Sequence, residues 1–289
     1  MELNSKTYFT TEMNLKYLDC STYKNFVGTI GRKGCECRAL AIAKGMYEQP
    51  KTEALLLGGY VDSFFDNSMS DFLSENMEDI YTKTSLQKFE KTGNPDDLKK
   101  YAFLDQADVM IARAKREPLF MEYMEGETQK ILTADIDGVP IRVKLDSYNG
   151  ERITDLKTVE SMSKTFFVAD VDSTSRKTAI TFAEYWGYIE QGFFYQTAVE
   201  QNFGKKLPFY LACITKEKTG SVAHPRLGVI HIPDHLIEQK GIDIKKNIHT
   251  VWNILQGNAM PIPCGTCEWC ADYLPLEKAI ELDQLMLEV

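Results

Sequence analysis

The chain has 289 residues, a net charge of −9 and 44% hydrophobic residues, which is typical of a soluble globular protein with a large core. We find no apolar run of about 18 residues and no charged leader before an apolar stretch, so the sequence predicts a cytoplasmic protein without a membrane span or secretory signal. The acidic balance argues against a generic basic coat for nucleic acid. It does not exclude a nucleic-acid enzyme, because metal ions reverse the local charge of an acidic site.

Residues 1–125 are predicted to be helical. Amphipathic stretches with capping residues predict helices at 21–27, 33–47, 52–66 and 96–114, with a turn at 93–96. In the third helix, Gly58 and Gly59 cost about 1 kcal/mol each, which predicts a close packing partner or a ligand. Asp62 lies one turn after Gly58 on the same face, so it is a candidate metal ligand or an ordinary residue of the polar face.

From residue 128 the hydrophobic period changes to that of a sheet. Strands are predicted at 129–136, 140–147 and 151–159, with turns at 137–138 and 149–150. A two-residue turn at Asn149-Gly150 would pair Tyr148 with Glu151. Asp146 would then lie opposite Ile153, with Asp155 as its diagonal neighbour on the same face.

Lys157 shares the face of Asp155, because side chains along a strand alternate with period two. Two carboxylates and an ammonium group therefore converge. Carboxylate oxygens suit Mg²⁺ and Mn²⁺, and a neighbouring lysine can hold an attacking water or offset charge on a phosphoryl oxygen. The alternative is an exposed hairpin with ordinary surface charges.

The remaining chain completes the order α–β–β–β–α–β. A partly helical segment is predicted at 161–175, strands at 206–215 and 226–232, and helices at 176–202, 235–255 and 275–288. In the helix at 176–202, Gln191 and Tyr195 lie on one side, with Tyr188 a turn earlier. These groups could bind a phosphate or hold Lys157, although an aromatic stripe is also typical of a core helix. The order predicts a compact α/β domain behind a helical N-terminal region.

Seven cysteines, an odd number, do not fit a secreted disulfide framework. The last three stand in a C-x2-C-x2-C pattern, which indicates soft-metal or iron–sulfur ligation with a fourth ligand from elsewhere; the alternative is unligated cysteines. Cys213, in a predicted strand, is expected in the core. The predicted cluster comprises Cys264, Cys267 and Cys270 with Cys35 as the preferred fourth ligand, ahead of Cys37 and Cys20.

Together these motifs resemble the RecB-type branch of the PD-(D/E)xK nuclease superfamily, and phage-borne RecE-like exonucleases most of all. That branch carries a G-x3-H helix, an aspartate at the end of a strand, a D/E-x-K strand and a Q-x3-Y helix. The chain has, in the same order, Gly58-x3-Asp62, Asp146, Asp155-x-Lys157 and Gln191-x3-Tyr195. Asp62 stands where many relatives have histidine, and it remains a competent, harder metal ligand.

The resemblance implies a restriction-endonuclease-like fold, a mixed sheet flanked by helices, and a DNA exonuclease dependent on Mg²⁺ or Mn²⁺. Asp62, Asp146, Asp155 and the Leu156 carbonyl would hold the metal, and Glu127 would add a contact through water. Lys157 would orient the attacking water and stabilise the transition state. Gln191 and Tyr195 would position Lys157 or the phosphate.

The resemblance also implies a single nuclease domain over residues 1–289, with a helical part at 1–125, the core at 126–256 and a cysteine-rich segment at 257–289. Some RecB-type members hold a [4Fe–4S] cluster with one cysteine upstream and three near the C-terminus. Linear duplex DNA in phage-type recombination, a single-strand annealing recombinase and homo-oligomers are the implied partners. Two alternatives remain: a non-catalytic nucleic-acid-binding module with the nuclease fold, and a metalloprotein organised only around the C-terminal cysteines.

Overall fold

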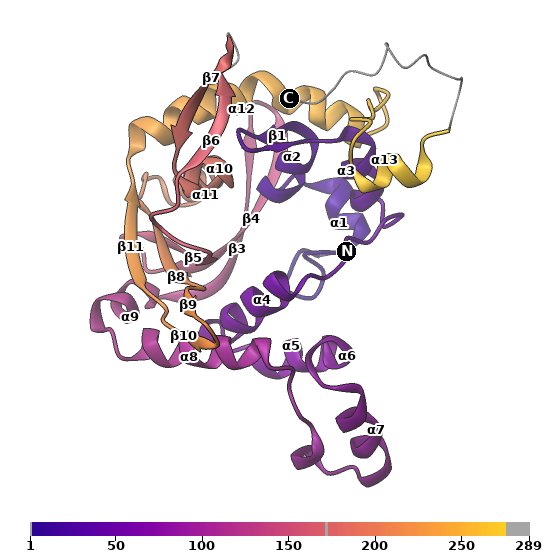
Figure 1. Cartoon of the computed structure of the whole chain (residues 1–289). Helices are drawn as coiled ribbons and strands as arrows, with labels where there is room; N and C mark the ends of the chain where they lie inside the picture. Colours follow the sequence, from indigo (N-terminus) through magenta and orange to yellow (C-terminus); the bar gives the residue numbers. More distant parts are fainter. Residues whose placement is uncertain (1, 171–172, 276–289) are drawn as a thin grey trace.

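A five-stranded mixed sheet forms the centre of the computed structural model, which describes residues 2–170 and 173–275 (Figure 1). β5 and β8 are parallel, and the other neighbouring pairs are antiparallel. This is the mixed α/β core that the sequence predicted. In sheet order, the strands are β11 (Leu227–Ile232), β8 (Phe209–Thr215), β5 (Ile153–Val159), β4 (Val139–Tyr148) and β3 (Glu127–Ile136).

Helices cover both faces of the sheet, so there are two hydrophobic cores. β5 reads as a nearly continuous buried run, as expected for a central strand covered on both faces. Alternate residues of one strand enter different cores, because Ile153 packs with the first and Leu156 with the second. The first core is built with α2 (Cys20–Val27), α3 (Glu36–Ala43), α11 (Tyr188–Phe203) and α12 (Asp234–Leu255), and the second with α4 (Glu53–Phe65), α8 (Phe103–Lys115) and α9 (Pro118–Met124).

The turn between β4 and β5 differs from the prediction. Tyr148 pairs with Ile153, so the connection has four residues instead of two. The Asn149 side chain explains this, because its Oδ1 accepts the backbone N–H groups of Glu151 and Arg152, both at 3.0 Å. The two-residue turn predicted at Asp137-Gly138 is confirmed by positive φ at both residues, 51° and 85°.

Three other predicted elements are wrong in detail. The segment 161–175, expected to be partly helical, and the start of the helix expected at 176–202 contribute instead to a hairpin of β6 (Phe166–Asp170) and β7 (Ser173–Ile180), which extends away from the sheet in Figure 1. The long helix expected from residue 176 is divided at Gly187 into α10 (Phe182–Tyr185) and α11. The helix expected from residue 96 begins only at Phe103, since Pro95–Asp97 forms a 3₁₀ turn (η1). The helix predicted at 275–288 lies outside the described residues, apart from Pro275.

Between α4 and α8 the chain makes an excursion that reaches farthest from the sheet at α7 (Figure 1). No helix in residues 2–170 and 173–275 is long and apolar enough to cross a membrane. The remaining elements are short: α1 (Thr11–Lys16), β1 (Gly28–Thr29), β2 (Arg32–Lys33), α5 (Met69–Glu75), α6 (Met77–Ile80), α7 (Lys83–Thr92), β9 (Lys218–Thr219), β10 (Val222–Ala223) and α13 (Glu268–Tyr273).

Candidate active site and cysteine cluster

The two candidate metal-binding aspartates lie where β4 and β5 separate. The ladder between these strands ends at the pair Ser147 and Thr154, the residues next to Asp146 and Asp155. The predicted diagonal placement, with Asp146 opposite Ile153, is therefore wrong, because the turn is two residues longer. Because the strands separate here, a side-chain oxygen takes the place of a backbone acceptor: the Leu156 N–H donates to Asp146 Oδ2 at 2.9 Å. The Leu156 carbonyl points to the same side, since both backbone groups of a strand residue do so.

Asp155 is the most enclosed of the acidic groups, with a relative exposure of 1%. Its Oδ1 accepts a hydrogen bond from Gln191 Nε2 at 2.9 Å. Its Oδ2 forms an ion pair with Lys157 Nζ. A buried carboxylate is costly unless it is paired, so this arrangement is held by the lysine and leaves acceptor capacity for a cation.

Gln191 and Tyr195 extend the network along α11. Gln191 Nε2 also contacts the Tyr195 hydroxyl at 2.7 Å, and that hydroxyl donates to the Lys144 carbonyl at 3.0 Å. One helix thus contacts β5 through Gln191 and β4 through Tyr195. Tyr188, a turn earlier, lies beside the lysine, with Lys157 Nζ 5.1 Å from the ring centroid.

Gly58 allows α4 to approach the same strand. A Cβ atom at this position would lie 3.1 Å from Thr158 Oγ1 on β5, so the predicted close packing partner is the sheet. The neighbouring Gly59 faces Phe72, whose Cε2 would be 2.6 Å from an added Cβ. Asp62 follows Gly58 by one turn and therefore reaches the acidic site from α4.

The electrostatics of the site favour a bound cation. Desolvation raises the pKa of Asp146 well above its usual value, and the charge of Asp155 adds to the rise. Desolvation also raises the pKa of Asp62 to about 7; Lys157 opposes this rise, while Asp155 and Asp66 add to it. Burial alone would lower the pKa of Lys157, but the charges of Asp155 and Asp146 outweigh burial and raise it, so the lysine remains protonated.

A hollow of about 490 Å³ brings the predicted residues together: Asp62, Asp146, Asp155, Leu156, Lys157, Gln191 and Tyr195 all line it. A smaller void of about 10 Å³, close to the space of one water molecule, is bounded by Asp62, Asp146 and Leu156. Hard oxygen donors around a small void fit Mg²⁺ or Mn²⁺. A larger hollow of about 880 Å³ beside α8 contains none of these carboxylates.

Glu127 is placed apart from this group. It forms an ion pair with Lys130 and lines neither hollow, because it lies on β3 beyond the point where the acidic residues meet. Gln129, two residues later, lines both hollows and has a φ of 54°, a conformation that non-glycine residues rarely adopt.

Sequence reasoning missed four further charged residues that line the hollow, Asp19, Asp66, Arg142 and Lys144, and two of them continue the predicted motifs. Lys144 precedes Asp146 by two positions on the same strand, and Asp66 follows Asp62 by four positions at the end of α4. Both line the hollow. The strand period and the helix period, the signals that indicated Asp155 and Lys157, would have found them.

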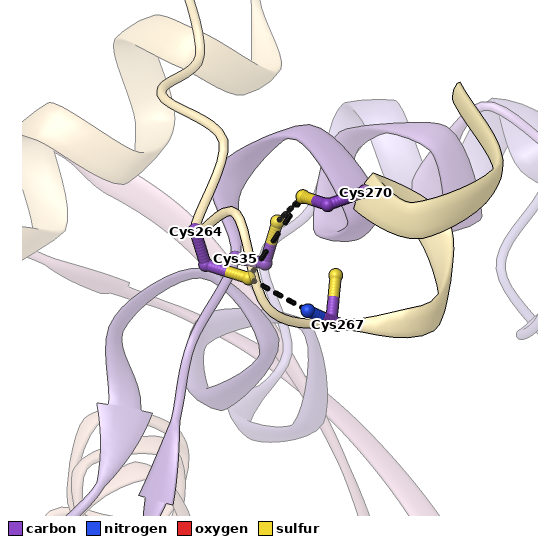
Figure 2. Close-up of side chains that lie close together, drawn as sticks. All are labelled: Cys35, Cys264, Cys267 and Cys270. Atoms are coloured by element: carbon purple, nitrogen blue, oxygen red, sulfur yellow. Dashed lines mark hydrogen bonds between the residues drawn. The ribbon is translucent and has the colours of Figure 1, made fainter. Parts of the chain in front are cut away.

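The four cysteines chosen from the sequence meet at a second site (Figure 2). The Sγ atoms of Cys35, Cys264, Cys267 and Cys270 all lie within 4.8 Å of one another. Cys35 stands immediately before α3. Cys264 and Cys267 precede α13, and Cys270 lies within it. The arrangement joins two parts of the chain that are more than 200 positions apart.

The other cysteines lie outside this cluster. Cys37 Sγ contacts the Pro261 carbonyl at 3.5 Å, and Cys20 is buried in the first hydrophobic core. Cys213 is fully buried in β8, which confirms its predicted core position. Among the described cysteines, Cys35 is therefore the fourth member.

Three comparisons relate this fold to known proteins. A search of curated proteins found no match. The crystal structure of a "Putative exonuclease" from Eubacterium rectale, at 2.19 Å resolution, is similar over 97% of both chains, with 34% identity and a TM-score of 0.86. A family model described as a PDDEXK-like domain of unknown function (DUF3799) matches residues 19–273. The chain thus has the restriction-endonuclease-like PDDEXK fold and belongs to this PDDEXK-like family.

Proposed function

We propose that this protein is a divalent-metal-dependent DNA exonuclease of the RecE-like type. The family and the likeness to the E. rectale protein support a nuclease. The observation that carries the finer proposal is the meeting of Asp62, Asp146, Asp155 and Lys157 in one hollow, with two carboxylates on separating strands and one on a helix.

Asp62, Asp146, Asp155 and the Leu156 carbonyl would hold Mg²⁺ or Mn²⁺. When bound, the metal would polarise the scissile phosphate and lower the pKa of the attacking water. The raised pKa values of Asp62 and Asp146 support this role, because a bound cation relieves the repulsion between carboxylates that stand in a desolvated cluster.

Lys157 would hold the attacking water and offset the charge that develops on the phosphoryl oxygens. Its protonated state suits the second role, and its ion pair with Asp155 places the ammonium group beside the metal ligands. Gln191 would fix the Asp155 carboxylate, and Tyr195 would fix Gln191, so both act as positioning residues. Glu127 has no direct role in this proposal.

The substrate would be linear duplex DNA, which would enter the hollow on the side lined by the N-terminal residues Tyr8 and Phe9. Lys144 offers a cation there, and its Nζ lies 4.9 Å from the ring of Phe9, an aromatic residue with 70% exposure. A cation beside an exposed ring suits a phosphate next to an unstacked base. Phage-type recombination, an annealing recombinase as partner and a homo-oligomer belong to the same proposal by resemblance to RecE-like enzymes.

End-labelled linear duplex DNA and covalently closed circular DNA, each incubated with Mg²⁺, Mn²⁺ or a chelator, test the proposal. We expect the linear DNA to be degraded from its ends only when metal is present, and the closed circles to survive. Nicking of the closed circles would instead show an endonuclease.

Lys157→Ala is the diagnostic variant, and Lys164→Ala is its matched control. Lys164 pairs with Glu160 on the surface, so its loss should leave degradation unchanged. Undiminished degradation by Lys157→Ala would contradict the proposed site. Stabilisation by metal and DNA binding, both without any turnover, would indicate a binding module with the nuclease fold.

A further inference from the structure

We propose that Cys35, Cys264, Cys267 and Cys270 bind one structural Zn²⁺ ion. The ion would fasten the segment that carries Cys264, Cys267 and Cys270 to α3, which forms part of the wall of the active-site hollow. The proposal concerns a second site, independent of the nuclease chemistry. It also differs from the [4Fe–4S] cluster that the family resemblance implies, and the spacing of the sulfur atoms is the reason.

Cys270 Sγ stands at the distance expected for a single tetrahedral ion from two of the other sulfur atoms. Four thiolates about 2.3 Å from one Zn²⁺ lie about 3.8 Å from each other. Cys270 Sγ lies 3.7 Å from Cys35 Sγ and 3.8 Å from Cys264 Sγ, and no pair of the four exceeds 4.8 Å. In a [4Fe–4S] cluster each thiolate binds a different corner iron, which separates the sulfurs by roughly 6 Å. The four cysteine sulfurs are therefore too close together for a [4Fe–4S] cluster.

The backbone around Cys264 is arranged to support a thiolate ligand. Its Sγ faces the N–H groups of Cys267 at 3.3 Å and Thr266 at 3.5 Å, and the Thr266 hydroxyl lies 3.7 Å away. Gly265, with a φ of 77°, allows the tight turn that aims these groups at the sulfur. Such hydrogen bonds orient a ligand and stabilise its negative charge.

Polar contacts beside the cysteines hold the same two segments together. Arg38 on α3 pairs with Glu268 on α13 at 2.8 Å, and Glu36 accepts the Ile262 N–H at 2.7 Å. Lys33 donates to the Cys264 carbonyl at 3.3 Å. These contacts are largely exposed and individually weak, so a metal ion would supply the strong link.

Helix α3, which Cys35 immediately precedes, forms part of the wall of the active-site hollow. The Cys35 N–H bonds to the Asn25 carbonyl of α2 at 3.0 Å, and Asn25 lines the hollow. Ile42, on the α3 helix that Cys35 precedes, lines it as well. Four protein ligands leave no open position on zinc, so the ion has a structural role, and thiolates select zinc while the carboxylate site suits a harder cation.

Metal and sulfide analysis of the full chain, purified anaerobically without added metal, tests the proposal. We expect about one zinc per chain, with neither iron nor acid-labile sulfide. Cobalt added in place of zinc during expression should give the visible absorption of tetrahedral Co²⁺ bound to thiolates. Iron in place of zinc, with or without sulfide, would overturn the proposal, as would a metal-free protein with oxidised cysteines.

Three variants locate the ion. Cys264→Ser should lose at least half of the zinc and lower the melting temperature, whereas Cys37→Ser, the matched control, should change neither. Asp155→Asn should keep its zinc, which separates the cysteine site from the carboxylate site. Zinc lost from Asp155→Asn but kept by Cys264→Ser would refute the assignment.

If Cys264→Ser does not fold, titration of the wild-type protein with a mercurial still decides the matter. The reagent should release one zinc as it modifies the cysteines. Release of zinc without any thiol modification, on addition of a weak chelator alone, would overturn the assignment. These measurements do not depend on DNA cleavage, so failure of the nuclease proposal would not affect them.

Discussion

Gln191 Nε2 on α11 donates to Asp155 Oδ1 on β5 at 2.9 Å, across 36 positions of the sequence. The second contact of Gln191, to the Tyr195 hydroxyl at 2.7 Å, keeps the amide in this orientation. A buried carboxylate thus has one oxygen held by an amide and the other facing the Lys157 ammonium. The relationship explains why a helix motif and a strand motif act as one unit.

Gln191→Ala should lower both activity and stability. The substitution removes the hydrogen bond to Asp155 Oδ1 and leaves a buried acceptor unsatisfied, which costs about 1–3 kcal/mol. Tyr195→Phe is the comparison variant, because it removes the contact that orients the amide but keeps the hydrogen bond between Gln191 and Asp155, so its losses should be smaller. Denaturant unfolding and the rate of DNA degradation at saturating Mg²⁺ measure the two effects. An equal loss in the two variants would show that the amide has no special role.

Lys157→Ala should reduce the rate of degradation by about 10²–10³-fold, the usual cost of losing a group that stabilises transition-state charge. The same change leaves the buried Asp155 without its positively charged partner, which destabilises the protein by about 3–5 kcal/mol when no metal is present. Mg²⁺ should restore much of this stability, since it supplies the missing positive charge. Melting temperatures with and without Mg²⁺ check this, and a Mg²⁺ effect no larger than in the wild type would contradict it.

Stabilisation by Mg²⁺ should increase with pH. The pKa of Asp62 is about 7 and that of Asp146 is also raised, whereas unfolded aspartate titrates near about 3.9. The folded state therefore binds more protons than the unfolded state between these values, so these two groups favour folding at acid pH and lose that contribution as pH rises through about 7. Mg²⁺ needs the deprotonated carboxylates, and below about pH 7 it must displace protons.

The rise in melting temperature caused by Mg²⁺ should accordingly be larger at about pH 8 than at about pH 6. Differential scanning fluorimetry at both pH values measures the difference. Asp62→Asn should reduce the pH dependence, since the asparagine cannot release a proton. A shift that is the same at both pH values would show that neither carboxylate loses a proton on binding.

Gly58→Ala should lower activity without unfolding the protein. Alanine favours a helix by about 1 kcal/mol over glycine, but its Cβ would meet Thr158 Oγ1 at 3.1 Å and push α4 away from β5. Asp62 would move with the helix. We therefore expect weaker Mg²⁺ binding, so that a higher Mg²⁺ concentration is needed for half-maximal activity, and a several-fold slower reaction. Thr158→Ala removes the opposing oxygen, and the double variant should recover activity. No recovery in the double variant would mean that the loss has another cause.

The local pattern of the sequence was sufficient to select seven residues that line the hollow, although it missed Asp66 and Lys144 and wrongly added Glu127 to the group. Period two along β5 places Asp155 and Lys157 on one face, and the helix period pairs Gln191 with Tyr195; neither relation depends on distant contacts. The glycine cost at Gly58 also indicated a close neighbour, although the sequence could not name Thr158. Strand period, helix period and the cost of glycine in a helix all depend on neighbouring residues of the chain, so the sequence alone is enough to recognise them.

The strand register at the site depended on whether the turn after Tyr148 had two or four residues, which the hydrophobic period does not show. The Asn149 side chain accepts two backbone N–H groups, which lengthens the turn and pairs Ser147 with Thr154, next to Asp146 and Asp155. The hairpin of β6 and β7 was missed because its residues carry no clear strand period. Asp66 and Lys144 joined the site only once α4 and β4 were seen on the same hollow.

The sequence by itself determined the five strands of the central sheet, the two aspartates and lysine of the strand motif, and the choice of Cys35 with the last three cysteines. Only the tertiary structure decided how close these groups stand. It gave the four sulfurs a spacing within 4.8 Å, and it separated β4 from β5 where Asp146 meets Leu156. Side-chain spacing results from packing between segments far apart in the chain, whereas ligand chemistry is a property of the residues themselves.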